Sequence, residues 1–414
     1  MREKASSPEA VILALLVVLA AAGIALGSSG DSGGESATAG AEAAAAKVAP
    51  IARRVETIRG LRFKQLPKPL IVTPAQARAD QLHAIDTLTS ADKRDVATKV
   101  LELLGLLKPG TDLRAVAGDV SGEQVAGYYD THRKRLAIVS GPLASDDVLS
   151  EITLAHELDH ALDDQAIGLS ENDSVAADDG ESAYTALIEG TATSVMDDYL
   201  RRYVKPSALL GSASAALGPG SSTEGIPPYI LSSLLFSYIS GEKLVNRLRE
   251  VAHGWKLVNY ALKSRPPRST EQVIHPDKYL ADERPVRVKL GVGAVLGSKW
   301  KRATHGTIGE FDTHQLLKLA VNSAVAGDAA AGWGGGTYEM WTAGSRSALV
   351  LGWAWDTPLD AKQFNRALRR YVAKRPGSGA AMAMHASPGL RTTLAIGPDA
   401  AAAERLASRA AARR

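Results

Sequence analysis

The 414-residue sequence contains no cysteine, and its formal net charge is only +3. Without cysteine the chain has no disulfides, no thiolate ligands and no cysteine for a lipid anchor, so any metal must be held by histidines and carboxylates. A charge this small for the length gives no electrostatic reason to expect a nucleic-acid partner.

The N-terminal residues are typical of an exported protein. Arg2 and Lys4 precede an uncharged apolar run, Ala10–Leu26, and a small-x-small pattern at Ala25 and Gly27 ends it. Such a run is either a signal peptide cleaved after the small residues or a short membrane-spanning helix. Because positive charge precedes the run, we expect the bulk of the chain outside the cytoplasm in both cases, either secreted or anchored to the membrane by a single span.

Composition divides the chain into four parts. Residues 1–27 form the signal peptide or anchor. Residues 28–50 are rich in glycine, serine and alanine, and are predicted to be a low-complexity tether because they offer little large apolar surface to bury. Residues 51–290 are predicted to form the domain that carries the chemistry. Residues 291–414 alternate helical and strand patterns, which predicts a C-terminal α+β unit.

Apolar patterns predict two helices and a hairpin ahead of the central motif. Residues 74–107 carry apolar side chains at helical spacing and end at "KPG". Val125–Tyr129 and Leu136–Val139 are short β-type runs joined by the polar stretch "DTHRKR", as in a hairpin. Ser145 is then suited to cap a helix that runs to about Gln165.

That helix contains the stretch "LAHELDHALDDQ", which includes the pattern H-E-x-x-H. His156 and His160 are four residues apart, so they project from one helix face as two ligands of a single ion would. Leu154, Leu158 and Leu162 indicate that the helix is largely buried. Since buried imidazoles need partners for their ring nitrogens, the pattern predicts a metal ion bound by both histidines.

The next helical stretch, "TALIEGTATSVM", offers a third ligand in Glu189. A carboxylate set among apolar residues is seldom left unpaired. Gly190 and Ala192 beside it are small, which would let this helix approach its neighbour closely. His156, His160 and Glu189 make a His₂Glu set with one open coordination position, which predicts one catalytic Zn²⁺ per chain.

"HELDH", followed about thirty residues later by "ALIEGTAT", resembles the zincin metallopeptidases, specifically the gluzincin (thermolysin-like) group. It looks closest to bacterial envelope proteins with a similar "AHE--HAL-DQ" and "AL-EG-AT". The resemblance covers about Gln124–Tyr203. It implies a zincin-like core of the α+β class that hydrolyses peptide bonds, with His156, His160 and Glu189 as zinc ligands and Glu157 as general base. It also implies an edge strand that pairs with a peptide or protein substrate.

The resemblance leaves two positions open. Thermolysin-like enzymes place an aspartate four residues after the ligand glutamate, where this chain has Thr193, so Thr193 or another carboxylate must orient His156. A histidine and a tyrosine stabilise the oxyanion in that group, which makes His275 and Tyr279 candidates here. Both lie in the Pro-rich segment "RPPRSTEQVIHPDKY", which is predicted to be irregular.

Two other functions remain compatible with these residues. Both "ELDH" and "REVAH" contain E-x-x-H, so Glu157, His160, Glu250 and His253, with Glu189 spare, match the ligands of a di-iron carboxylate bundle. The hairpin and the Gly/Pro-rich surroundings argue against four long helices. The other alternative is a non-catalytic zincin-fold protein of the cell envelope that binds without cutting and retains its zinc for stability.

Overall fold

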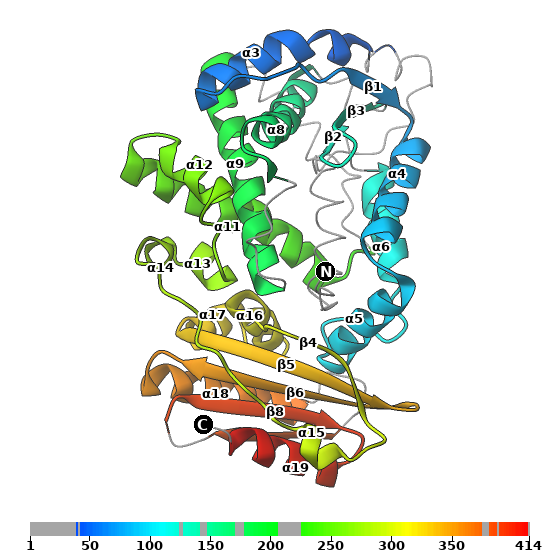
Figure 1. The fold of residues 1–414 in the computed structure, drawn as a ribbon, viewed down its shortest axis with the longest axis vertical. Coiled ribbons are helices and arrows are strands. Elements are labelled where there is room, and N and C mark those ends of the chain that lie inside the picture. Colours follow the sequence, from blue (N-terminus) through cyan, green and yellow to red (C-terminus); the bar gives the residue numbers. More distant parts are fainter. Residues whose placement is uncertain are drawn as a thin grey trace.

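The computed structural model describes residues 39, 42–123, 127–140, 147–169, 178–205, 225–374, 381–386 and 389–412. Figure 1 shows helices and a small sheet in the upper part and a larger sheet with flanking helices in the lower part. The chain is a mixed α+β protein, as predicted. The apolar run Ala10–Leu26 lies outside the described residues, and no helix among those residues is long and apolar enough to cross a membrane.

The small sheet contains the predicted hairpin. Strand β2 (Gly127–Asp130) pairs antiparallel with β3 (Arg135–Val139), and β1 (Pro69–Val72) runs parallel to β3 on its other side. The strand order is therefore β1-β3-β2, with β2 at an edge within the described part of the chain. β2 ends one residue later than predicted, and Val125 lies outside the described residues.

The two helices predicted for residues 74–107 are α4 (Pro74–Leu88) and α5 (Ala91–Leu103), and α6 (Leu113–Glu123) follows them. The start of α4 is fixed by a capping box. The Thr73 hydroxyl accepts from the backbone N–H of Gln76, and the Gln76 side chain accepts from the backbone N–H of Thr73. Ser90 caps α5 through its hydroxyl.

The tether predicted for residues 28–50 ends earlier than expected. Helix α3 (Val48–Arg59) begins inside that range, and Ala44 before it is also helical. Ala44 and Val48 are buried in an apolar cluster with Leu154. Alanine has a high helix propensity, and a helix rich in alanine can pack closely against an apolar cluster. The composition alone did not show that such a cluster lies beside these residues.

Three long helices form the centre of the upper part, namely α8 (Asp147–Ala166), α9 (Asp179–Tyr203) and α11 (Pro228–Ala252). Two glycines let α9 and α11 touch backbone to backbone. A Cβ added at Gly190 would lie 2.1 Å from the carbonyl carbon of Gly241, and one added at Gly241 would lie 1.9 Å from the carbonyl oxygen of Ala186. The crossing brings α11 against the part of α9 that carries Glu189. Ser145, the predicted cap of α8, lies outside the described residues.

The Pro-rich segment after α12 (Lys256–Lys263) is only partly irregular, so the prediction for it was wrong in its middle part. It contains the short helices α13 (Thr270–Ile274) and α14 (Pro276–Leu280). The Ser269 hydroxyl caps α13 by accepting from the backbone N–H of Gln272, and Pro276 occupies the first position of α14. Proline is well suited to that position because the first helical N–H needs no partner within the helix.

The C-terminal region forms a five-stranded antiparallel sheet of order β4-β5-β6-β8-β7. Its strands are β4 (Lys301–Gly306), β5 (Trp333–Ala343), β6 (Arg346–Trp355), β7 (Ala381–Ala386) and β8 (Arg391–Gly397). Its helices are α15 (Gly293–Leu296), α16 (Glu310–Lys318), α17 (Ser323–Ala330), α18 (Pro358–Lys374) and α19 (Ala400–Ala411). The long hairpin β5–β6 is the Trp- and Gly-rich region that the sequence predicted as strands.

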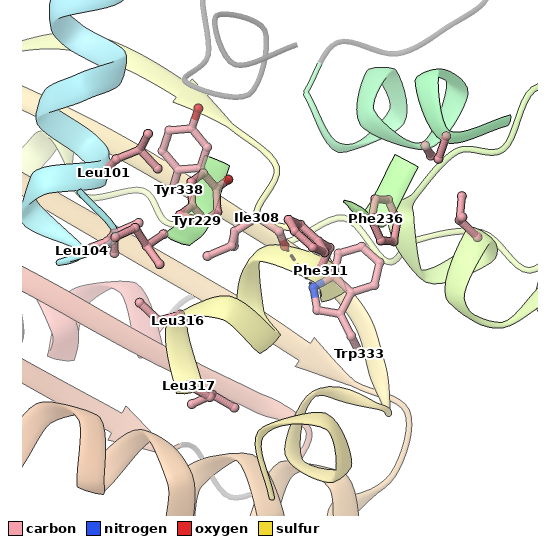
Figure 2. Packing of buried hydrophobic residues seen from close by; sticks show 14 of the residues in the cluster. Leu101, Leu104, Tyr229, Phe236, Ile308, Phe311, Leu316, Leu317, Trp333 and Tyr338 are labelled. Carbon is pink, nitrogen blue, oxygen red and sulfur yellow. Dashed lines mark hydrogen bonds between the residues drawn. The ribbon is translucent and has the colours of Figure 1, made fainter. Parts of the chain in front are cut away.

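This sheet shares a hydrophobic core with the helices before it (Figure 2). Leu101 of α5 and Leu104 at its end belong to the same buried cluster as Tyr338 of β5, and Figure 2 shows the Tyr338 ring beside Leu101. The Tyr371 hydroxyl of α18 donates to the backbone oxygen of Leu104 at 2.9 Å. The predicted boundary at residue 291 therefore does not divide the apolar interior into two separate cores.

Gly241→Ala should destabilise the fold strongly, because the added Cβ meets the backbone of Ala186 and the two helices must separate. We expect a loss of about 3 kcal/mol or more in the free energy of unfolding. Gly327→Ala in α17 is the matched control, since no atom lies within 4 Å of its added Cβ. It should be neutral or stabilise by about 0.5–1 kcal/mol. Urea unfolding followed by circular dichroism measures both, and equal losses would contradict the close crossing.

Candidate metal centre

Two buried histidines project from one face of α8. His156 and His160 are 3% and 5% exposed, and their rings lie 4.7 Å apart at nearly a right angle. Their Nε2 atoms are 3.1 Å apart. Leu154, Leu158 and Leu162 are buried on the other faces of the helix, in the cluster that includes α3 and the small sheet. The helix is thereby held with both imidazoles pointing at one position.

Glu189 of α9 completes the cluster. Its Oε2 lies 3.2 Å from Nε2 of His156, and its Oε1 lies 3.6 Å from Nε2 of His160. The Glu189 side chain is buried, so its carboxylate depends on protein groups such as these imidazoles for its contacts. The structure thus brings together the three residues that the sequence singled out as ligands.

The spacing of the two Nε2 atoms and the Glu189 carboxylate, which places a different oxygen near each imidazole, fits a tetrahedral metal ion. Bonds of about 2.0–2.1 Å at tetrahedral angles place ligand atoms about 3.3 Å apart. The observed separations of 3.1, 3.2 and 3.6 Å bracket that value. Two imidazoles and one carboxylate are also the donor set of catalytic zinc sites with an open position.

The charges of the cluster favour a cation at its centre. Burial opposes protonation of His160, but the charges of Glu189 and Glu157 outweigh it and raise the pKa of His160 to about 9. Burial likewise opposes ionisation of Glu189, but the two histidines lower its pKa to about 2. The cluster therefore retains a proton at neutral pH, which a divalent cation would displace on binding.

Glu157 is the fully buried neighbour of the first histidine. Its Oε2 accepts a hydrogen bond of 2.8 Å from the backbone N–H of Tyr129 in β2. Its other oxygen, Oε1, is buried and has no hydrogen-bond partner within the described residues. Burial raises the pKa of the Glu157 carboxyl well above its usual range. A buried carboxylate oxygen without a partner calls for an explanation, and a proton-accepting role would provide one.

Tyr238 of α11 is a neighbour of the cluster that the sequence analysis missed. Its ring lies 5.9 Å from that of His156, and its hydroxyl is in hydrogen-bond contact with Glu189. Burial, with the charges of Glu189 and Glu157, holds the pKa of this phenol well above its usual range. The only sequence signal was indirect, because Gly241 follows one turn later and permits the approach to α9.

His275 and Tyr279 are engaged elsewhere. Nε2 of His275 lies 2.9 Å from Oε1 of Glu310 in α16. The Tyr279 hydroxyl donates to the backbone oxygen of Arg265 at 2.8 Å, and the Arg265 guanidinium lies over the Tyr279 ring. These contacts join His275 to α16 and Tyr279 to Arg265 before α13. The phenol beside His156 and Glu189 is therefore Tyr238 and not Tyr279.

Thr193 does not supply the missing carboxylate contact to His156. Its hydroxyl donates to the backbone oxygen of Glu189 at 2.8 Å, one turn earlier in α9. Among the described residues this hydroxyl makes no hydrogen bond to His156. The Tyr238 ring lies 5.9 Å from the His156 ring and is one of the neighbours that restrict its orientation, with Glu189 and His160.

The second E-x-x-H pair lies apart from the cluster. Glu250 pairs with Arg247 at 2.8 Å, and His253 ends α11 in the left-handed backbone conformation. Glu250 is more than three turns beyond Tyr238 on the same helix, or about 18 Å along its axis. The pair is therefore too distant to share an ion with His160 and Glu189.

A second group of carboxylates within ion-binding reach of one another, Glu271, Glu283 and Asp356, already surrounds a cation. The Lys278 ammonium lies 2.6, 2.7 and 2.6 Å from these three residues. The group is a salt-bridge network that links α13 and α14 to the end of β6.

A buried arginine of α3 forms ion pairs with α8, the helix that carries His156 and His160. The Arg59 guanidinium of α3 donates to Asp159, lies 2.7 Å from Asp163 and donates to Asn259 at 2.8 Å. The side chains of Arg59, Asp159 and Asp163 are at most 3% exposed. The guanidinium also stacks on the Trp255 ring. Since Asp159 directly precedes His160, this network fixes the second histidine relative to α3.

Comparison with known proteins covers only the C-terminal part of the chain. A family model described as "Domain of unknown function (DUF8575)" matches residues 296–408. No curated protein and no solved structure matches the chain. The matched region contains β4 to β8 and lies outside α8 and α9, which carry His156, His160 and Glu189.

Arg59→Met should destabilise the protein by about 3–5 kcal/mol, because it leaves two buried carboxylates without their counter-ion. Arg62→Met is the matched control three residues later, where the exposed guanidinium pairs with Glu56. Loss of that surface pair should cost about 0–1 kcal/mol. Thermal and urea unfolding measure both changes. A small loss for Arg59→Met would contradict the role of this network.

Proposed function

We propose that this protein is a zinc-dependent peptidase. The observation that carries the proposal is the convergence of His156, His160 and Glu189 on one point, with the unpartnered Oε1 of Glu157 beside them. The zincin-like fold suggested by "HELDH" and "ALIEGTAT" is part of the same proposal. When bound, zinc supplies Lewis acidity, which lowers the pKa of a coordinated water toward about 7 and polarises a carbonyl group.

The residues around the cluster have complementary roles in this proposal. Glu157 accepts a proton from the attacking water through Oε1 and later passes it to the leaving amide nitrogen. A carboxylate with a raised pKa is a stronger base for that transfer. The Tyr238 hydroxyl donates to the substrate oxygen as negative charge develops there. His275 and Tyr279 take no part.

A peptide is the substrate that the surroundings favour. β2 is an edge strand among the described residues, and its Tyr129 N–H contacts Glu157. The edge therefore runs beside the metal-binding cluster. Extended peptides bind such edges through main-chain hydrogen bonds. Bound in this way, a scissile bond would be carried toward Glu157.

His160→Ala should abolish stoichiometric zinc binding, because two protein ligands hold the ion poorly. We expect about one zinc per chain in the wild type and close to none in the variant, measured by elemental analysis after dialysis. His83→Ala, at an exposed position of α4, is the control and should retain the zinc. Full zinc retention in His160→Ala would refute the ligand assignment, and two irons per chain would favour the di-iron alternative.

Glu157→Gln should retain zinc while turnover of a peptide library falls by a factor on the order of 10² or more. The amide keeps the size of the side chain and its acceptor for Tyr129 but removes the base. Equal cleavage by the variant and the wild type would show that Glu157 is not the base. Absence of cleavage by the wild type across a broad library would favour the non-catalytic binding alternative.

We also propose that the folded region works outside the cytoplasm, released or held at the membrane by the run Ala10–Leu26. The flanking charges of that run support this orientation. A reporter fused after Arg414 that is active only on the outer side of the membrane is the expected result. Activity confined to the cytoplasm would contradict it.

A further inference from the structure

We propose that Tyr129 is the positioning residue that holds Glu157 for proton transfer, a role that rests on the proposed peptidase function. Tyr129 makes two separate contacts with α8. Its backbone N–H donates to Oε2 of Glu157 at 2.8 Å, and its hydroxyl donates to Oδ2 of Asp164 at 2.9 Å. One buried residue of the edge strand therefore clamps the helix at two points.

The two contacts fix where β2 lies along α8. Glu157 and Asp164 are seven residues apart, which is two turns or about 10 Å along the helix axis. A single contact would let the strand slide or pivot on the helix surface. Two contacts at this separation hold its direction, so the Tyr129 N–H stays aligned with the Glu157 carboxylate.

Asp164 is itself held in place from the hairpin turn. The Lys134 ammonium lies 2.7 Å from both oxygens of Asp164. Lys134 has a φ of 53°, a left-handed backbone conformation that non-glycine residues rarely adopt. Lys134 of the hairpin turn and Tyr129 of the edge strand thus both contact the Asp164 carboxylate. These two contacts attach the hairpin to α8.

The clamp determines which oxygen of Glu157 is available for chemistry. The N–H of Tyr129 engages Oε2 and restrains rotation of the carboxylate, while Oε1 has no partner in the described part of the chain. A base held in one orientation transfers a proton faster than one that rotates, because the reacting geometry is set in advance. Loss of the Asp164 contact should loosen this arrangement without removing the base.

Tyr129→Phe tests the clamp, since it removes only the hydroxyl that reaches Asp164. On the best peptide from the library digest, we expect kcat to fall about tenfold while KM stays within about twofold of the wild type. Zinc should remain at about one per chain, because no ligand is touched. A purely structural role would lower stability without this separation of kcat from KM.

Tyr128→Phe is the matched control in the same strand. Tyr128 is also buried, and its hydroxyl donates to the carboxylate of Asp80 at 2.6 Å. Asp80 belongs to α4 and not to α8, the helix of Glu157. Both variants should lose similar thermal stability, whereas Tyr128→Phe should keep kcat within about twofold. Equal kcat losses in the two variants, or an unchanged kcat in Tyr129→Phe, would overturn the proposal.

Amide hydrogen exchange tests the same contact without any turnover. Glu157→Ala removes the acceptor, so the Tyr129 N–H should exchange at least about tenfold faster, whereas Glu157→Gln should keep its protection. Tyr129→Phe should accelerate the exchange and Tyr128→Phe should not. If the wild type cleaves no peptide, the proposed function fails, yet exchange still decides the clamp. Unchanged exchange in both Glu157→Ala and Tyr129→Phe would refute it.

Discussion

The buried charge of Arg59 is the constraint on which the position of α8, the helix of His156 and His160, depends. Removing a guanidinium and two carboxylates from water costs several kcal/mol per ion, and the cost is offset only while every partner stays in place. α8 therefore cannot slide or rotate against α3 without leaving Asp159 or Asp163 buried and unpaired. His160, next to Asp159, is held by the same penalty. This penalty acts in addition to the contacts that the His160 ring makes with His156 and Glu189.

Packing constrains the other side of the cluster. Glu189 and Tyr238 belong to α9 and α11, and they meet because Gly190 and Gly241 allow the two backbones to touch. A catalytic constellation must be held within about half an ångström by its supporting residues. The cluster thus lies between α8, which buried ion pairs hold in place, and the pair α9 and α11, which close backbone packing holds together. Neither support comes from the residues that would bind the metal.

The parts of the site that could be predicted are those with a local signal. His156 and His160 share a helix turn, and the apolar neighbours of Glu189 indicated its burial. Tyr238 could not be predicted, because a tyrosine in an apolar helix is as typical of a hydrophobic core as of a functional site. Only the crossing of α9 and α11 shows that this tyrosine lies beside Glu189. Which helix packs against the C-terminal unit could not be predicted for a related reason. Apolar spacing shows that a face is buried but not which element covers it, and α5 covers part of the C-terminal sheet.

The long sequence separations in the Arg59 network bear on the order of folding. Arg59 precedes Asp159 by 100 residues and Asn259 by 200. Contacts between residues so far apart in sequence form late in folding, because the entropy cost of closing the loop comes before the stabilisation that the contact provides. During synthesis α3 emerges long before its counter-ions exist, and its guanidinium stays hydrated until they arrive. A growing chain therefore lacks the assembled cluster of His156, His160 and Glu189, and the activity proposed for that cluster would begin only after most of the protein has been made.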